Sequence, residues 1–120
     1  NIVIEVNTSL KPIDLMKILL KIEHDLERER KNKNDPRTCD IDIIDYKNES
    51  MNLKLEELQL KIPHVSMKER DFVLLPLKEI CPYWSHPLTK EPIDHLINNL
   101  KGKNNNITKL SQSDIINYVE

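Results

Sequence analysis

The 120-residue sequence contains little glycine, little cysteine and few aromatic side chains. Its single glycine, Gly102, excludes the glycine-rich phosphate-binding loops of the Walker and Rossmann types within this chain. Two cysteines are too few for a disulfide framework and are not spaced as metal ligands. We therefore expect a protein of a reducing compartment, either the cytoplasm or an organelle.

The chain also lacks a long apolar run and an excess of either charge. No stretch approaches the ~18 apolar residues that a membrane-spanning helix requires, so no membrane partner is expected. The 18 basic and 20 acidic side chains give a net charge of −2, which provides no basic surface for nucleic acid. Hydrophobic residues still make up 38% of the chain, enough for a modest folded core.

The first third of the chain predicts a strand followed by a helix. Apolar residues alternate with other residues over positions 1–7, which is the pattern of a strand with two different faces. Thr8 and Pro12 then predict the start of a helix, as the N-terminal cap and the early proline. The apolar stripe of this helix, which we expect to be buried, consists of Leu15, Leu19, Ile22 and Leu26.

The rest of the chain predicts further strands and helices in alternation. A second strand is expected over residues 38–46, whereas residues 53–60 fit either a strand or a short helix. An apolar stretch over residues 72–77 ends in a helical turn, and a helix is expected over residues 92–100. Interleaved strands and helices predict a layered α/β or α+β domain.

Two aspartates in the second expected strand are the most informative feature. Asp40 and Asp42 are two residues apart, so on a strand their side chains lie on the same face. Mg²⁺ is commonly held by one or two carboxylates together with substrate phosphates, and Arg37 just upstream could bind a phosphate. The alternative interpretation is an ordinary polar outer face of a half-buried strand.

A second cluster of chemically useful residues lies further along the chain. His64 and Arg70 could bind phosphate, and Phe72 could stack on a flat heterocycle. The alternative is a loop histidine, a solvated charge run and a core phenylalanine. A third feature, the charged run with Arg28 and Arg30, is by itself typical of a solvated helix end.

These features occur together in one order, and in that order the chain resembles the 6-hydroxymethyl-7,8-dihydropterin pyrophosphokinase family. The family signature is a basic residue, any residue, a small residue, then Pro-Arg-x-x-Asp-x-Asp and two aliphatic residues. The matching positions are Lys33, Pro36, Arg37, Asp40, Asp42, Ile43 and Ile44. The resemblance covers roughly residues 1–88. It departs from the family at Asp35, in the place of the small residue, and at Asn34, where the family often has an aromatic residue.

The resemblance implies a fold, a reaction and two cofactors. The fold is a ferredoxin-like α/β (α+β) domain, an antiparallel sheet with helices on both faces, whose N-terminal strand and loop lie outside this chain. The reaction is the transfer of pyrophosphate from ATP to 6-hydroxymethyl-7,8-dihydropterin in folate biosynthesis, with release of AMP. Two Mg²⁺ ions and ATP as co-substrate are implied.

The resemblance also assigns roles to individual residues. The implied metal ligands are Asp40 and Asp42, in agreement with the argument from their spacing. The implied catalytic arginines are Arg28, Arg30 and Arg37. The implied ATP-binding residues are Glu23, Ile43, His64 and Arg70. The implied pterin-binding residues are Asn1 and Phe72.

Domain organisation follows from the same resemblance. We expect residues 1–101 to be the C-terminal part of a pyrophosphokinase domain, and residues 102–120 to be a linker and short helix before a following domain. The expected partners are the missing N-terminal segment of the domain and a fused dihydropteroate synthase. Two alternatives remain: a non-catalytic packing or dimerisation module of a bifunctional folate enzyme, and a generic metal- or nucleotide-binding protein of another family.

Overall fold

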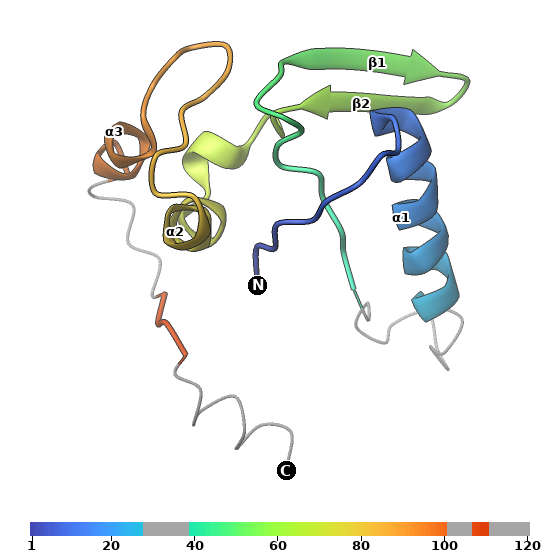
Figure 1. The fold of residues 1–120 in the computed structure, drawn as a ribbon. Coiled ribbons are helices and arrows are strands. Elements are labelled where there is room, and N and C mark those ends of the chain that lie inside the picture. The colour runs from blue at the N-terminus through green and yellow to red at the C-terminus, as the bar shows by residue number, and fades with distance from the viewer. Residues whose placement is uncertain (28–38, 101–106, 111–120) are drawn as a thin grey trace.

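The computed structural model describes residues 1–27, 39–100 and 107–110. The elements, in chain order, are α1 (Pro12–Glu27), β1 (Met51–Leu55), β2 (Leu58–Ile62), the short 3-10 helix η1 (Met67–Glu69), α2 (Asp71–Ile80) and α3 (Ile93–Asn98). Figure 1 shows α1 on one side and α2 with α3 on the other, with the segments 1–11 and 39–50 running between them. The chain is therefore α+β, as expected. The expected linker and last helix, residues 102–106 and 111–120, lie outside the described residues.

Helix α1 begins where its sequence predicts. The Thr8 hydroxyl accepts a hydrogen bond from the Leu10 N–H at 3.0 Å, and Pro12 is the first helical residue. The expectation of a buried stripe on this helix is wrong, because none of its described side chains is buried and Ile22 is 42% exposed. The physical reason is that no other helix or strand of the described chain packs extensively against α1.

The ambiguous segment 53–60 lies in an antiparallel hairpin of β1 and β2. Its register pairs Met51 with Ile62, Leu53 with Leu60 and Leu55 with Leu58, so the apolar residues of both strands share one face. Two residues connect the strands, and Glu56 adopts the left-handed conformation at φ 55°. The peptide bond between Ile62 and Pro63 at the end of β2 is cis.

The two other expected strands do not form. Residues 1–7 and 39–45 have no strand hydrogen bonding, and β1 and β2 make the only sheet in the part of the chain that the structure describes. Alternating hydrophobicity indicates an extended chain with two faces, but a strand also needs a partner for its backbone groups. Without one, Ile2 and Ile4 are 84% and 68% exposed.

The core lies at the α2–α3 side of the molecule. Its buried members are Met67, Val73, Leu74, Leu77, Trp84, Ile93 and Leu96. Val3 and Ile44 pack against this cluster, so both extended segments contact the core even though neither is a strand. The expected helices are confirmed here: α3 begins directly after Pro92, and the apolar stretch 72–77 lies within the longer α2. Within the described residues, no helix is both long enough and apolar enough to cross a bilayer.

A tight loop between α2 and α3 buries His86, which is 8% exposed. Its Nδ1 accepts hydrogen bonds from the N–H groups of Leu88 and Thr89 at 3.2 and 3.3 Å. Burial lowers the pKa of His86, nearby Lys68 lowers it further, and Glu91 and Asp45 partly oppose this. Because Nδ1 is an acceptor, the folded protein holds the neutral imidazole.

This burial predicts a pH-dependent stability. The folded pKa of His86 lies below its unfolded value of about 6.5, so the unfolded chain binds the extra proton first. The free energy of unfolding should therefore fall as pH drops below about 6.5, by at most about 1.4 kcal/mol per pH unit from this residue. Urea unfolding between pH 5 and 8 measures the slope. His86→Asn, whose amide oxygen can still accept from the loop, should flatten it. An equal slope in wild type and His86→Asn would contradict the assignment.

Candidate active site

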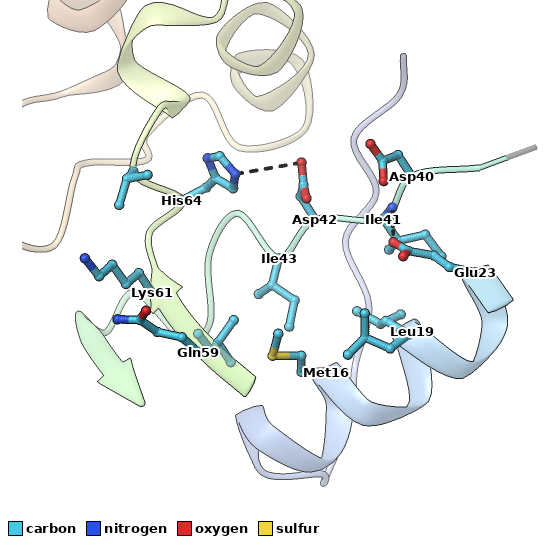
Figure 2. A pocket seen from close by; sticks show the side chains of 13 residues that line it. Met16, Leu19, Glu23, Asp40, Ile41, Asp42, Ile43, Gln59, Lys61 and His64 are labelled. Carbon is cyan, nitrogen blue, oxygen red and sulfur yellow. Dashed lines mark hydrogen bonds and ion pairs between the residues drawn. The ribbon is translucent and has the colours of Figure 1, made fainter. Parts of the chain in front are cut away.

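The acidic pair lies on an extended segment between α1 and the hairpin. Asp40 and Asp42 flank Ile41, and Figure 2 shows both carboxylates on the same side of this segment. Their common face matches the geometry expected from the two-residue spacing, although the segment is not a strand. Both residues are exposed, Asp42 with 49% of its side chain accessible. Two accessible carboxylates so close together favour a bound cation.

Glu23 in the last turns of α1 fixes the start of this segment. Its Oε1 accepts a hydrogen bond from the Ile41 backbone N–H at 2.6 Å, visible in Figure 2. An ionised acceptor makes this a strong hydrogen bond, and it lies between the two aspartates. Glu23 therefore positions the acidic pair, whatever further contact it makes with a ligand.

Removing this hydrogen bond should cost stability. Glu23→Ala leaves the half-buried Ile41 N–H without its acceptor, so we expect the free energy of unfolding to fall by about 1–3 kcal/mol. Glu23→Gln retains an oxygen acceptor and should lose less. Asp25→Ala removes an exposed carboxylate from the same helix and is the matched control. Urea unfolding measures all three, and equal losses for Glu23→Ala and Asp25→Ala would contradict the role of Glu23.

Two basic side chains approach the Asp42 carboxylate, one following β2 and the other just before α2. His64 Nε2 and Arg70 Nη1 each lie 3.9 Å from Asp42 Oδ2. The Ser66 N–H donates to His64 Nδ1 at 3.2 Å, which leaves Nε2 as the protonated nitrogen facing Asp42. Carboxylates beside N–H donors make a site that suits a cation together with an anion.

Arg70 is fixed by the start of α2. Its carbonyl accepts hydrogen bonds from the N–H groups of Val73 and Leu74, both at 3.0 Å. Its guanidinium carbon lies 5.6 Å from the centre of the Phe72 ring, close enough for a cation–π interaction. Phe72 itself is half-buried and packs against the core cluster. Arg70 thus connects Phe72 to the acidic pair.

An open cavity of about 450 Å³ adjoins these residues. Five of the expected site residues line it, namely Glu23, Asp40, Asp42, Ile43 and His64. Met16, Leu19 and Ile43 give it an apolar side, while the carboxylates and His64 give it a polar one (Figure 2). Such a mixed lining suits a ligand with a flat apolar part and a charged part.

Three expected site residues lie elsewhere in the described chain. Arg70 and Phe72 do not line the cavity, but Arg70 reaches Asp42. Asn1 is exposed and does not line the cavity either. The three expected catalytic arginines, Arg28, Arg30 and Arg37, lie outside the described residues.

Sequence reasoning missed several residues of the cavity wall. Gln59 and Lys61 on β2 line it, as do Met16 and Leu19 on α1. Gln59 and Lys61 are the polar residues of an alternating strand, so this face could have been found once the hairpin was recognised. Met16 gives no comparable signal, because apolar helical residues are more often core residues.

The donor set of the acidic pair fits magnesium. Carboxylate oxygens are the ligands that Mg²⁺ takes, and the ion usually keeps water and substrate phosphates as its other ligands. Throughout residues 1–27, 39–100 and 107–110, no three histidine, cysteine, aspartate or glutamate side chains are grouped as metal ligands. Two accessible carboxylates beside an open cavity are therefore compatible with an ion completed by its substrate.

Comparison with known proteins identifies the family. Residues 1–82 match the family model of 7,8-dihydro-6-hydroxymethylpterin-pyrophosphokinase. This match covers more than half of the chain, and it includes the acidic pair, His64, Arg70 and Phe72. The chain belongs to the 7,8-dihydro-6-hydroxymethylpterin-pyrophosphokinase family.

Individual relatives agree with this assignment. The chain is 47% identical over 87 residues to the folic acid synthesis protein of Dictyostelium discoideum, covering 72% of this chain and 13% of that protein. It is 40% identical over 93 residues to the 2-amino-4-hydroxy-6-hydroxymethyldihydropteridine pyrophosphokinase of Aquifex aeolicus, covering 78% and 56%. For the enzyme of the same name from Bacillus subtilis the identity is 43% over 81 residues, covering 68% and 46%. The chain thus spans about half the length of these bacterial relatives.

Proposed function

We propose that the protein carrying this chain transfers pyrophosphate from ATP to 6-hydroxymethyl-7,8-dihydropterin and releases AMP, a step of folate biosynthesis. The observation that carries the proposal is the convergence of His64 and Arg70 on Asp42, beside Asp40, at an open cavity of a chain that belongs to this family. Pterin-dependent release of AMP from ATP tests it.

The chemistry of this transfer requires alignment and charge neutralisation more than a protein nucleophile. The pterin hydroxyl oxygen forms a bond to the β-phosphorus of ATP, the bond from that phosphorus to the bridging oxygen of the α-phosphate breaks, and AMP leaves with that oxygen. The hydroxyl proton passes to solvent. The protein's contribution is to hold the two substrates in line and to place positive charge against the phosphate oxygens.

Asp40 and Asp42 would hold two Mg²⁺ ions in this proposal. When bound, Mg²⁺ neutralises the negative charge of the transferred phosphates. His64 and Arg70 would then donate to phosphate oxygens, for which a protonated Nε2 and a planar guanidinium are suited. Ile43 would contact the base of ATP from the apolar side of the cavity, and Glu23 would hold the acidic pair in place.

The remaining expected roles are part of the same proposal. Arg28, Arg30 and Arg37 would supply further positive charge to the phosphates during transfer. Asn1 and Phe72 would bind the pterin, the first by hydrogen bonds to its edge and the second by stacking on its ring. The position of Arg70 between Phe72 and Asp42 supports placing the pterin next to the phosphates.

Phe72 provides a test of the pterin side. Phe72→Leu keeps an apolar side chain against the core but removes the aromatic face, so pterin affinity should fall by about 1–3 kcal/mol, more than ATP affinity falls through the lost support of Arg70. Phe72→Tyr keeps the ring and should bind nearly as well as wild type. Calorimetric titration with the pterin measures the affinities. A lower melting temperature with unchanged pterin affinity in Phe72→Leu would show that Phe72 is only a core residue.

The proposal extends to the surroundings of this chain. We infer that residues 1–101 form the C-terminal part of the kinase domain and that residues 102–120 lead to a following domain. The strongly exposed Ile2, Ile4 and Val6 support a covering segment from the rest of the kinase domain. A fused dihydropteroate synthase is the proposed following domain. The similar Dictyostelium protein is named for folic acid synthesis. The match covers only 13% of it, so most of that protein lies outside the matched region.

A further inference from the structure

Within the described residues, the segment that carries Asp40 and Asp42 pairs with neither β1 nor β2. Its direction depends on side-chain contacts along the segment, where Asp42 faces His64 and Arg70 and Ile44 packs against the core, and on contacts at its two ends. Glu23 fixes the beginning through the Ile41 N–H. The other end enters a turn, residues 45–49, in which Lys47 and Asn48 both have positive φ. What holds this turn therefore contributes to where Asp42 points.

Asp45 connects the turn to the core. Its Oδ1 accepts a hydrogen bond from Trp84 Nε1 at 3.1 Å, and its Oδ2 accepts one from the Asn48 backbone N–H at 3.1 Å. Both carboxylate oxygens are thus engaged by N–H donors. An asparagine could accept only one of these hydrogen bonds through its oxygen, so the carboxylate suits this place better than its amide.

Trp84 is a rigid anchor for this connection. It is 9% exposed and belongs to the core cluster, and its backbone N–H donates to the Cys81 carbonyl at 3.1 Å. Its carbonyl accepts from the Ile93 N–H at 2.9 Å. The indole is therefore fixed by packing and by backbone hydrogen bonds on both sides. A buried indole N–H needs an acceptor, and Asp45 supplies it.

A second connection runs parallel to the first. Asn48 Nδ2 donates to the Ser85 carbonyl at 2.8 Å, next to Trp84 along the chain. The Tyr46 hydroxyl also donates to the Leu10 carbonyl just before α1. The turn after the acidic pair is thus attached to the core on one side and to the start of α1 on the other.

We propose that Asp45 is a positioning residue for the acidic pair, which acts by attaching the turn after Asp42 to the buried indole of Trp84. This inference rests on the proposed function, because it assigns to Asp45 a role in the geometry of the Mg²⁺ ligands. Both oxygens of Asp45 accept hydrogen bonds from the chain, which suits a residue that positions other groups. Residues that orient metal ligands from behind change metal affinity even though they never touch the metal.

The test uses the full-length protein and the Mg²⁺ concentration that gives half-maximal pyrophosphate transfer. Asp45→Leu removes both hydrogen bonds and should raise this concentration roughly tenfold. Trp84→Phe keeps an aromatic side chain in the core but removes the indole donor, and should also raise this concentration. Asp45→Asn retains one acceptor and should lie between wild type and Asp45→Leu. Glu49→Gln removes an exposed charge from the same turn and should leave it unchanged.

Two further readouts separate positioning from stability. The double variant Asp45→Leu with Trp84→Phe should require no more Mg²⁺ than Asp45→Leu alone, because both changes break one connection. Mn²⁺ affinity in the presence of the α,β-methylene analogue of ATP, measured by electron paramagnetic resonance, should weaken in parallel without any turnover. Melting temperatures without ligands report the loss of fold stability separately.

The outcomes are distinct. Lower melting temperatures with wild-type Mg²⁺ and Mn²⁺ dependence in Asp45→Leu and Asp45→Asn would overturn the positioning role and leave the proposed function standing. Additive effects in the double variant would overturn the route through Trp84. A wild-type protein without Mg²⁺-dependent transfer, or an Asp42→Asn variant as active as wild type, would overturn the proposed function and this inference with it.

Discussion

Replacing Asp42 with asparagine should reduce the turnover number for pyrophosphate transfer by roughly 1,000-fold, and Asp40→Asn should have an effect of the same order. Either change removes one of two carboxylates proposed to hold Mg²⁺ against the ATP phosphates, so the charge that develops during transfer is left without its counterion. The fold should survive, because Asp42 is about half exposed and its contacts with His64 and Arg70 are 3.9 Å long. Steady-state kinetics at saturating ATP and pterin measures the loss.

The control for this prediction is Asp94→Asn on α3. It makes the same chemical change at an exposed aspartate, whose carboxylate is paired with Lys78 and does not line the cavity beside the acidic pair. Its turnover number should equal that of wild type, and its stability should change by less than about 1 kcal/mol. Wild-type turnover in both Asp40→Asn and Asp42→Asn would contradict the metal assignment.

Replacing Arg70 with alanine should lower kcat/KM for ATP by roughly 100-fold. The guanidinium lies beside Asp42 and above the Phe72 ring, where it can donate to a phosphate oxygen while the aromatic face supports it. Arg70→Lys keeps the charge but loses the planar pair of donors, so it should recover only part of the activity. Kinetics at varied ATP concentration separates the effect on binding from that on turnover.

Lys78→Ala is the comparison for Arg70, since it removes an exposed cation of α2 that is paired with Asp94 and not with the acidic pair. It should leave kcat/KM for ATP unchanged. If Arg70→Ala and Lys78→Ala had the same kinetics, Arg70 would be a surface charge paired with Asp42 and not a phosphate contact.

The sequence predicted those elements whose signals are local. Thr8 and Pro12 placed the start of α1, and Pro92 placed the start of α3, because caps and prolines act within a few residues of themselves. The hairpin stayed ambiguous because its leucines, at 53, 55, 58 and 60, fit both the two-residue repeat of a strand and the 3.6-residue repeat of a helix in so short a segment. In the structure they alternate on both sides of a two-residue turn.

Features that depend on distant partners could not be predicted. Residues 1–7 and 39–45 have the alternation of strands, but neither segment pairs with another strand in the described chain. The stripe of α1 has helical spacing, yet nothing in the sequence tells whether another element covers it. The hydrogen bond between Asp45 and Trp84 joins residues 39 positions apart. No sequence motif indicates that such an aspartate and tryptophan are partners.

The candidate site was predictable where spacing alone determines geometry. The two-residue spacing of Asp40 and Asp42 places them on one face of any extended segment, whether or not it belongs to a sheet. The family resemblance assigned His64 and Arg70 to ATP without giving their distances from the aspartates, and the structure places each of them 3.9 Å from Asp42 Oδ2. The roles of these residues in catalysis remain predictions that the substitutions above test.

The most direct test of the central claim is the release of AMP from ATP and Mg²⁺ by the full-length protein, measured with and without 6-hydroxymethyl-7,8-dihydropterin. We predict AMP only when the pterin is present, in equal amount to the pyrophosphorylated pterin. AMP release that does not depend on the pterin would indicate a nucleotide-hydrolysing protein instead. Absence of AMP under both conditions would contradict the claim and favour a non-catalytic packing or dimerisation module.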